Sequence, residues 1–138
     1  MQQPLSKRDH DCLESVQSLS TDGWPARVKD VAGKMGISAP TAVGFLEKLH
    51  ALGLIEKGPS GYRLTAKGVD SFNEATRTHR ILETLLVRNG LPLDEACRVS
   101  SSVDAPIPDT ELEKLCKNMR HPDVCPHGRP IPGGSRHV

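Results

Sequence analysis

The chain has 138 residues, the size of one globular domain or of two small ones that share a core. Charged residues make up 25% of it and hydrophobic residues 36%, and no apolar run reaches the roughly 20 residues of a membrane span, which excludes a membrane-spanning or disordered protein. Its 18 basic and 17 acidic side chains give a net charge of +1, so any contact with nucleic acid must come from a local patch.

The N-terminus and the cysteines together predict a location in the reducing cytoplasm. The first 14 residues, MQQPLSKRDHDCLE, lack the apolar stretch of a secretion signal. Cysteines in a reducing compartment serve as metal ligands or packed thiols more often than as disulfides. We therefore interpret the four cysteines as thiols.

The first part of the chain predicts two short helices. Apolar residues recur at helical spacing from Leu5 to Leu19 and again from Arg27 to Met35. Residues 21–23, Thr-Asp-Gly, predict the end of the first helix. Gly36 tolerates the left-handed conformation and predicts the end of the second.

A third helix is expected to run to about Leu52. Ser38 is its N-cap, and Pro40 lies in the first turn, where its missing N–H costs nothing. The residues predicted to point inward are Ala42, Phe45, Leu46 and Leu49. The outward face, which carries small apolar groups, comprises Pro40, Val43, Gly44 and Glu47.

Two short apolar segments after the third helix predict a hairpin. Residues 54–57 and 62–64 flank the turn sequence Gly-Pro-Ser-Gly at 58–61. Three helices followed by a hairpin indicate a winged helix-turn-helix.

The rest of the chain predicts a mainly helical second part. Thr65 caps a long helix over residues 66–87, a fifth helix covers residues 95–102, and Asp109 caps a sixth. The last 18 residues are rich in proline and glycine and predict an extended tail.

The winged part is expected to bind DNA. The second helix of a helix-turn-helix enters the major groove with its N-terminal side chains toward the bases. The outer face of the expected helix has no Arg, Asn or Gln in its first turns, so specificity would depend on thymine methyl contacts and DNA shape. The candidate DNA-binding residues are Arg27, Lys34, Ser38, Ala39, Pro40, Thr41, Val43, Gly44, Lys48, Tyr62 and Arg63.

Several side chains in the sequence could bind a metal ion. They are His79 with Glu83, four apart on the long helix; Cys125 with His127 in the tail; Asp11 with Glu14 on the first helix; and Cys97. Taken alone, each signal leaves an alternative open. His79 and Glu83 could be a buried hydrogen-bonded pair, Asp11 and Glu14 a solvated face, and Cys97 a packed thiol. Cys12 and Cys116 are interpreted as packed thiols.

These segments together resemble the iron- and manganese-dependent repressors of the diphtheria-toxin-repressor family, in particular the short class without a C-terminal SH3-like domain. The resemblance rests on RVKDVAGKMGISAPTAVGFLEKLHALGLIEKG, LTAKG, THRILETLLV, LPLDEACRV and CPHGRPIPG. It implies a winged helix-turn-helix domain over residues 1–70, a helical dimerisation and metal-binding domain over 71–120, and a tail over 121–138 that contributes ligands. It also implies a homodimer that binds palindromic operator DNA when metal occupies sites between the first helix and the dimerisation domain.

The resemblance also implies ligands residue by residue. The positions that match ligands of the family are Asp11, Glu14, His79, Glu83, Cys97, Cys125 and His127. The chain departs from the family's pattern at Ser100 and Ser101, where Glu and His are usual, and at Leu93, where His is expected. We therefore predict that His79, Glu83, Cys125 and His127 form the surviving site.

The function expected from the sequence is a metal-dependent transcriptional repressor. Thiolates favour Fe²⁺, which we place first, or Zn²⁺ over Mn²⁺ as the divalent effector. Two alternatives stay open: a winged-helix regulator that senses redox state or holds an iron–sulfur cluster through its cysteines, and a dimeric protein-binding adaptor. An enzyme is not expected, because the sequence has no paired nucleophile and base and no phosphate-binding loop.

Overall fold

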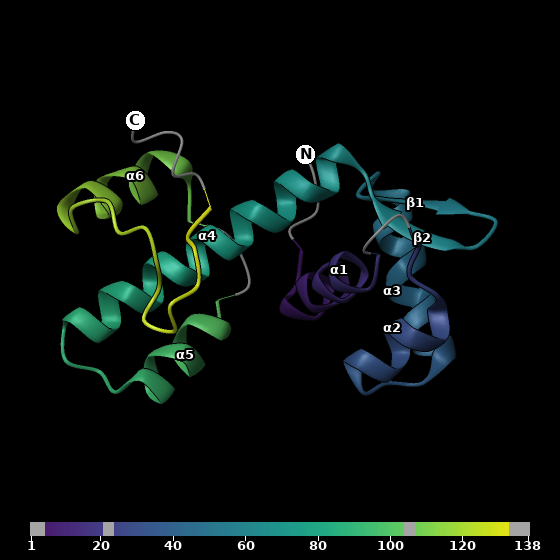
Figure 1. The fold of residues 1–138 in the computed structure, drawn as a ribbon, viewed down its shortest axis with the longest axis horizontal. Helices are drawn as coiled ribbons and strands as arrows, with labels where there is room; N and C mark the ends of the chain where they lie inside the picture. Colours follow the sequence, from purple (N-terminus) through teal and green to yellow (C-terminus); the bar gives the residue numbers. More distant parts are fainter. Residues whose placement is uncertain (1–4, 21–23, 104–106, 133–138) are drawn as a thin grey trace. The chain divides into compact units, whose positions relative to one another are not determined.

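The structure is a computed structural model that describes residues 5–20, 24–103 and 107–132. It divides into two compact units, Met1–Phe72 and Asn73–Val138, each described by itself below (Figure 1). The described residues are mainly helical with one two-stranded sheet, which confirms the predicted fold class. The stop predicted at residues 21–23 lies outside the described residues. No helix within the described ranges has the length and apolar character to cross a membrane.

Three helices open the first unit: α1 (Lys7–Leu19), α2 (Val28–Met35) and α3 (Ala39–Ala51). Local hydrogen bonds set their ends. The hydroxyl of Ser38 accepts from the backbone N–H of Thr41 at 3.3 Å, as expected of an N-cap. Gly36 ends α2 with a φ of 67°, the left-handed conformation that the sequence predicted for it.

The wing of the first unit is a hairpin of β1 (Ile55–Gly58) and β2 (Gly61–Leu64), paired antiparallel. A third segment joins it, because Ala26 and Tyr62 exchange two backbone hydrogen bonds of 2.8 Å. Gly61 has a φ of 144°, and a Cβ there would lie 2.4 Å from the carbonyl oxygen of Ala26. A glycine is therefore needed where the third segment approaches the wing.

The core of the first unit lies between the three helices and the wing. Its fully buried members include Leu13, Leu46, Leu49 and Ile55. Phe45, predicted to point inward with Leu46 and Leu49, packs against this core while partly buried. The helical periodicity of the sequence thus identified the inner face of α3 correctly.

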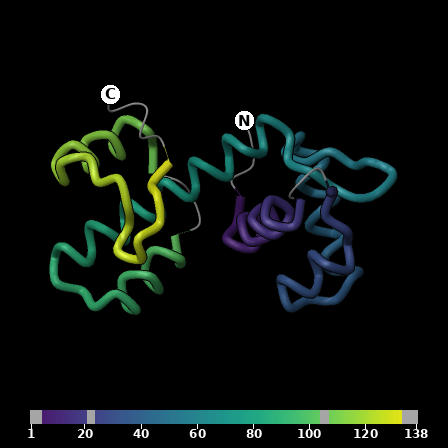
Figure 2. The backbone as a smooth tube through the Cα atoms, viewed as in Figure 1, coloured from purple at the N-terminus to yellow at the C-terminus, as the bar shows by residue number. Residues whose placement is uncertain are grey.

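The second unit contains most of α4 (Ala66–Arg88), followed by α5 (Leu93–Ser101) and α6 (Asp109–Asn118) (Figure 2). Thr65 caps α4 as predicted, its hydroxyl accepting from the backbone N–H of Gly68 at 3.1 Å. The buried apolar residues of this unit come from α4, α6 and the tail: Ile81, Leu112, Cys116, Met119, Cys125 and Ile131.

Two expectations for the second unit were wrong. Asp109 is the first residue of α6 and not its cap; Pro108 occupies the cap position, and the Asp109 carboxylate accepts from the guanidinium of Arg77 at 3.3 Å. The described part of the tail is folded and not extended, since Val124 and Pro130 form an antiparallel bridge. Proline and glycine exclude a helix, but they leave the chain free to turn and bury its apolar side chains.

Candidate functional site

A buried carboxylate lies at the centre of the candidate metal site. Glu83 on α4 is 1% exposed. One of its oxygens lies 3.1 Å from Nε2 of His79, and the other lies 2.8 Å from Nδ1 of His127. A buried carboxylate needs a compensating charge or donor on each side, and these two imidazoles take those positions.

Two elements of local structure bring these groups together. His79 and Glu83 are four residues apart on α4 and therefore share one face of the helix. His127 lies in a turn of the tail, where the backbone N–H of Gly128 donates to the carbonyl of Cys125 at 2.8 Å. The turn places Cys125 and His127 beside the carboxylate of Glu83, and His127 is 44 residues from Glu83 in sequence.

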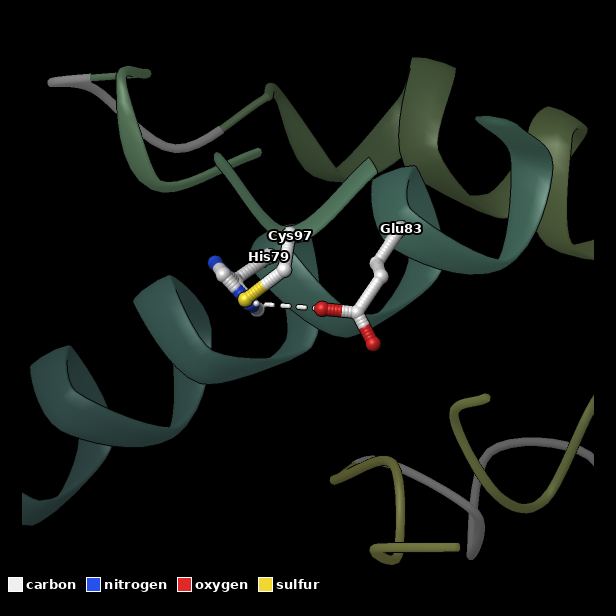
Figure 3. Close-up of side chains that lie close together, drawn as sticks. All are labelled: His79, Glu83 and Cys97. Atoms are coloured by element: carbon white, nitrogen blue, oxygen red, sulfur yellow. Dashed lines mark hydrogen bonds and ion pairs between the residues drawn. The ribbon is translucent and has the colours of Figure 1, made fainter. Parts of the chain in front are cut away.

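Glu83 belongs to two groups of possible ligands within the second unit. In the first, donor atoms of His79, Glu83 and Cys97 lie within 4.8 Å of one another; Figure 3 shows Cys97 from α5 beside the ring of His79. In the second, donor atoms of Glu83, Cys125 and His127 lie equally close. Each group offers one nitrogen, one oxygen and one sulfur, a mixed set that suits Fe²⁺ or Zn²⁺.

This arrangement differs in detail from the set favoured by the sequence. The sequence placed His79, Glu83, Cys125 and His127 around one ion, whereas the structure distributes them over two groups that share Glu83. Cys97, kept apart from that set, joins His79 in the first group. Which of these residues bind metal stays a prediction. Among the described residues of the second unit, the candidate ligands are the members of these two groups.

Ser100 and Ser101 mark the departure from the family's pattern. Ser100 is 2% exposed, and its hydroxyl has no hydrogen-bond partner among the described residues. It follows Cys97 by three residues on α5, so both lie on one side of the helix. The position is therefore buried and polar but lacks the charge that a carboxylate ligand would bring.

Asp11 and Glu14, the expected ligands on the first helix, lie on α1 in the first unit. Glu14 is exposed, and the Asp11 carboxylate lies 4.0 Å from the guanidinium of Arg8. Their role as ligands stays a prediction.

The remaining cysteines fit the interpretation as packed thiols. Cys12 and Cys116 are fully buried, each in the core of its own unit. Burial, together with the nearby charge of Asp9, raises the pKa of Cys12 to about 12, and burial also raises the pKa of Cys116. Among the described residues each candidate metal group contains a single thiol, which does not match the four thiolates that commonly hold an iron–sulfur cluster.

The first unit presents the expected nucleic-acid surface at the start of α3 and on the wing. The exposed members of the predicted set are Arg27, Lys34, Ser38, Ala39, Pro40, Thr41, Gly44 and Arg63, while Val43 is partly buried. These residues stay candidates for DNA contact.

Two residues of the predicted DNA set have other surroundings. Tyr62 is 6% exposed and belongs to the core, because alternation along β2 turns it inward while its neighbour Arg63 points outward. The ammonium of Lys48 lies 2.7 Å from the carboxylate of Asp9, which is 1% exposed. Lys48 therefore joins α3 to α1 within the unit.

Sequence reasoning missed Asp9, although a pattern in the sequence points to it. Ser6 and Asp9 form a capping box, in which the serine hydroxyl accepts from the Asp9 backbone and the carboxylate accepts from the Ser6 backbone. Burial alone would raise the pKa of Asp9, but the Lys48 ammonium and the Ser6 donors outweigh it and hold that pKa below its ordinary value.

Comparison with known proteins decides the family. Residues 65–133 match the family described as the iron dependent repressor, metal binding and dimerisation domain. The chain belongs to this family of repressors. The resemblance noted in the sequence is thereby confirmed, and the region that matches contains both candidate metal groups.

Relatives of this repressor support the same conclusion. It is 31% identical over 104 residues to the transcriptional regulator MntR of Escherichia coli O6:H1, an alignment that covers 75% of this chain and 67% of MntR. Hypothetical protein SSo2273 from Sulfolobus solfataricus has a similar structure, with a TM-score of 0.83 and 30% identity over 93% of this chain and 99% of that one.

ScaR, solved with bound Cd²⁺, has a TM-score of 0.74 and 29% identity, covering 95% of this chain and 61% of ScaR. The chain thus spans about three fifths of ScaR and two thirds of MntR. The family consists of transcriptional regulators and not enzymes, as the sequence predicted.

Proposed function

We propose that this repressor binds operator DNA as a homodimer when a divalent transition metal occupies the second unit. Its membership in a family with a metal-binding and dimerisation domain supports this proposal. The observation that carries it is the buried carboxylate of Glu83, which lies between two imidazoles with a thiol within 4.8 Å on either side.

The chemistry of the donors fits a metal ion. A carboxylate that is 1% exposed is costly to bury unless cations or hydrogen-bond donors compensate it. A divalent ion would supply positive charge to Glu83 and use the nitrogen and sulfur donors that already face it. His79 with Cys97, or Cys125 with His127, would complete three protein ligands in either group.

The thiols favour particular metals. Soft sulfur ligands select Fe²⁺ or Zn²⁺ over Mn²⁺, which prefers oxygen. Ser100 adds a hydroxyl where a carboxylate would favour Mn²⁺. We therefore place Fe²⁺ first as effector, with Zn²⁺ next, and expect Mn²⁺ to bind more weakly.

In this proposal the metal acts on DNA binding by selecting one arrangement of the dimer. An ion that binds the DNA-competent arrangement more tightly shifts the equilibrium toward it. Typical coupling of about 1 to 3 kcal/mol would tighten operator binding roughly 5- to 150-fold. The two halves of a palindromic operator would then be about one helical turn apart, or a multiple of that distance.

Elemental analysis and DNA affinity test the proposal together. The wild-type chain is expected to bind Fe²⁺ or Zn²⁺, and added metal is expected to tighten its binding to operator DNA selected from random duplexes. Glu83→Gln keeps the shape of the side chain but removes its charge, so metal binding and the metal response should be lost. The matched control is Glu95→Gln, an exposed position on α5. A Glu83→Gln protein that keeps the full metal response would contradict the proposal.

Two further variants assign the ion to one group or both. Cys97→Ser removes the thiol of the first group, and Cys125→Ser removes that of the second. If each group holds an ion, each variant loses one metal per protomer; if only one group does, only its own variant loses metal.

A further inference from the structure

Two arginines of α4 hold the tail segment that carries the second group of candidate ligands. Arg88 donates to the carbonyl oxygen of Met119, where the chain leaves α6. Arg80 donates to the carbonyl oxygen of Pro130, near the other end of the segment. Each bond joins a side chain of the helix to a backbone group of the tail, so the two arginines attach the tail at two separate points.

The bond from Arg80 lies at the base of the loop that carries the candidate ligands. The two ends of this loop, Val124 and Pro130, form an antiparallel bridge. Inside the loop the backbone N–H of Cys125 donates to a backbone carbonyl at 2.8 Å. Because the loop is closed on itself, a side chain bound at Pro130 fixes the place of both Cys125 and His127.

The loop meets α4 on the side that carries the shared carboxylate. Arg80 precedes Glu83 by three residues, a spacing that places both on one side of a helix. Next to the loop, Ile131 is 8% exposed and belongs to the same buried cluster as Ile81 and Cys125. The arginine bond and the apolar burial therefore both bring the loop to Glu83.

We propose that Arg80 is a positioning residue for the second metal group, in which its guanidinium holds the loop so that Cys125 and His127 face Glu83 before an ion binds. This inference rests on the proposed function, since it concerns how one of the two groups holds the divalent ion. Ligands that are already in place lose little conformational entropy on binding. A held loop therefore raises metal affinity although Arg80 does not contact the ion.

The direction of the effect separates positioning from charge. A guanidinium near a divalent cation repels it, so the loss of this charge alone would tighten metal binding. Loss of the bond to the loop would instead weaken metal binding, because the loop must then be ordered when the ion binds. Arg80→Met keeps the aliphatic stem and removes both the charge and the donor. The two roles thus predict opposite results for this one variant.

Titration of the full chain with Co²⁺ measures the second group when Cys97→Ser is the parent protein. A thiolate ligand gives Co²⁺ an ultraviolet charge-transfer band, and in this parent Cys125 is the thiol that the two groups retain. Arg80→Met in this parent should weaken Co²⁺ binding by about 10- to 100-fold, the usual cost of losing a group that orients a ligand. Arg80→Lys, which can donate to the same carbonyl, should restore most of the affinity.

Two controls test whether the effect is specific. Arg88→Met removes the same kind of bond from the same helix, but at the end of the segment away from the ligands, and should leave Co²⁺ affinity close to that of the parent. With Cys125→Ser as the parent, the thiolate band of Cys97 reports on the first group and should not change in Arg80→Met. Thermal unfolding of each variant without metal measures any general loss of stability.

The outcomes separate this inference from the proposed function. Unchanged or tighter Co²⁺ binding in Arg80→Met would overturn the inference alone, as would a loss that Arg80→Lys does not reduce. Equal weakening in Arg88→Met would also overturn it, because the effect would then come from a general loosening of the unit. A Cys97→Ser parent without a thiolate band would overturn it by showing that Cys125 binds no metal. Failure of the wild-type chain to bind any divalent metal would overturn the proposed function as well.

Discussion

Each unit of the molecule buries a carboxylate, and the two are stabilised in different ways. Asp9 in the first unit has an ammonium at 2.7 Å and the donors of a capping box. Glu83 in the second unit has two imidazoles, with thiols within 4.8 Å. The first carboxylate has its charge compensated by a cation of the chain itself, whereas the second gathers the ligand types of a transition metal. Burial alone therefore does not distinguish a structural acid from a candidate metal ligand; the partners of the carboxylate do.

The largest expected effect is on the second carboxylate. Zn²⁺ or Fe²⁺ at roughly a thousandfold excess over its dissociation constant should stabilise the wild-type protein by about 4 kcal/mol. Thermal unfolding with and without metal measures this, with Glu95→Gln as the control. In Glu83→Gln the increase should vanish. An equal increase in that variant would show that the ion binds elsewhere.

A smaller effect is expected at the first carboxylate. Lys48→Met keeps the aliphatic stem but leaves Asp9 buried without its cation, which should lower the free energy of unfolding by about 2 kcal/mol. Asp9→Ala should cost only about 1 kcal/mol, the value of a lost cap, because Lys48 is 40% exposed and can reach water.

Urea unfolding of both single variants and of the double variant measures the coupling between Asp9 and Lys48. We expect the double variant to be no less stable than Asp9→Ala. Fully additive losses would mean that the ion pair contributes nothing.

Asp9 should also make stability depend on pH. Its pKa is lowered in the folded state, so its contribution is fully present above the ordinary pKa of aspartate, about 3.9, and is lost as the pH falls through the lower folded value. Wild type should therefore lose stability more steeply than Asp9→Asn below about pH 4. Urea unfolding of both proteins across this pH range measures the difference in stability. If the free energy of unfolding depends on pH equally in the two proteins, that result would argue against the lowered pKa of Asp9.

The smallest effect concerns the thiols and leaves stability unchanged. At about pH 8 a thiol with a pKa of about 12 is ionised in about one molecule in ten thousand, so alkylating reagents should not label Cys12 in the folded protein. Cys97, which is partly exposed, should react first, and bound metal should protect it. Mass spectrometry of labelled peptides measures the order. Labelling of Cys12 as fast as Cys97 would contradict its burial.

Much of the fold and part of the site could be predicted from the sequence. Ser38, Gly36 and Thr65 identified helix ends, because capping depends on hydrogen bonds between residues a few positions apart. His79 and Glu83 were recognised together because four residues place them on one face of a helix. The turn residues at 58–61 located the wing for the same local reason.

Other features could not be predicted from spacing or periodicity because they join distant parts of the chain. Asp9 and Lys48 are 39 residues apart. Glu83 and His127 are 44 apart, and it was the family resemblance, not their spacing, that placed them in one predicted site. No spacing rule reaches across such separations. Tyr62 was assigned to the DNA surface because composition alone does not tell which face of a short strand points inward.

The sequence by itself determined the elements, their caps and the family, because each of these depends on local hydrogen bonds, on periodicity or on contiguous motifs. Only the tertiary structure decided the environment of the two carboxylates. It paired Asp9 with Lys48, divided the predicted ligands of the second unit into two groups around Glu83, and placed Trp24 beside the wing. The physical reason is that charge compensation and ligand geometry depend on distances in space, which packing sets after the local elements have formed.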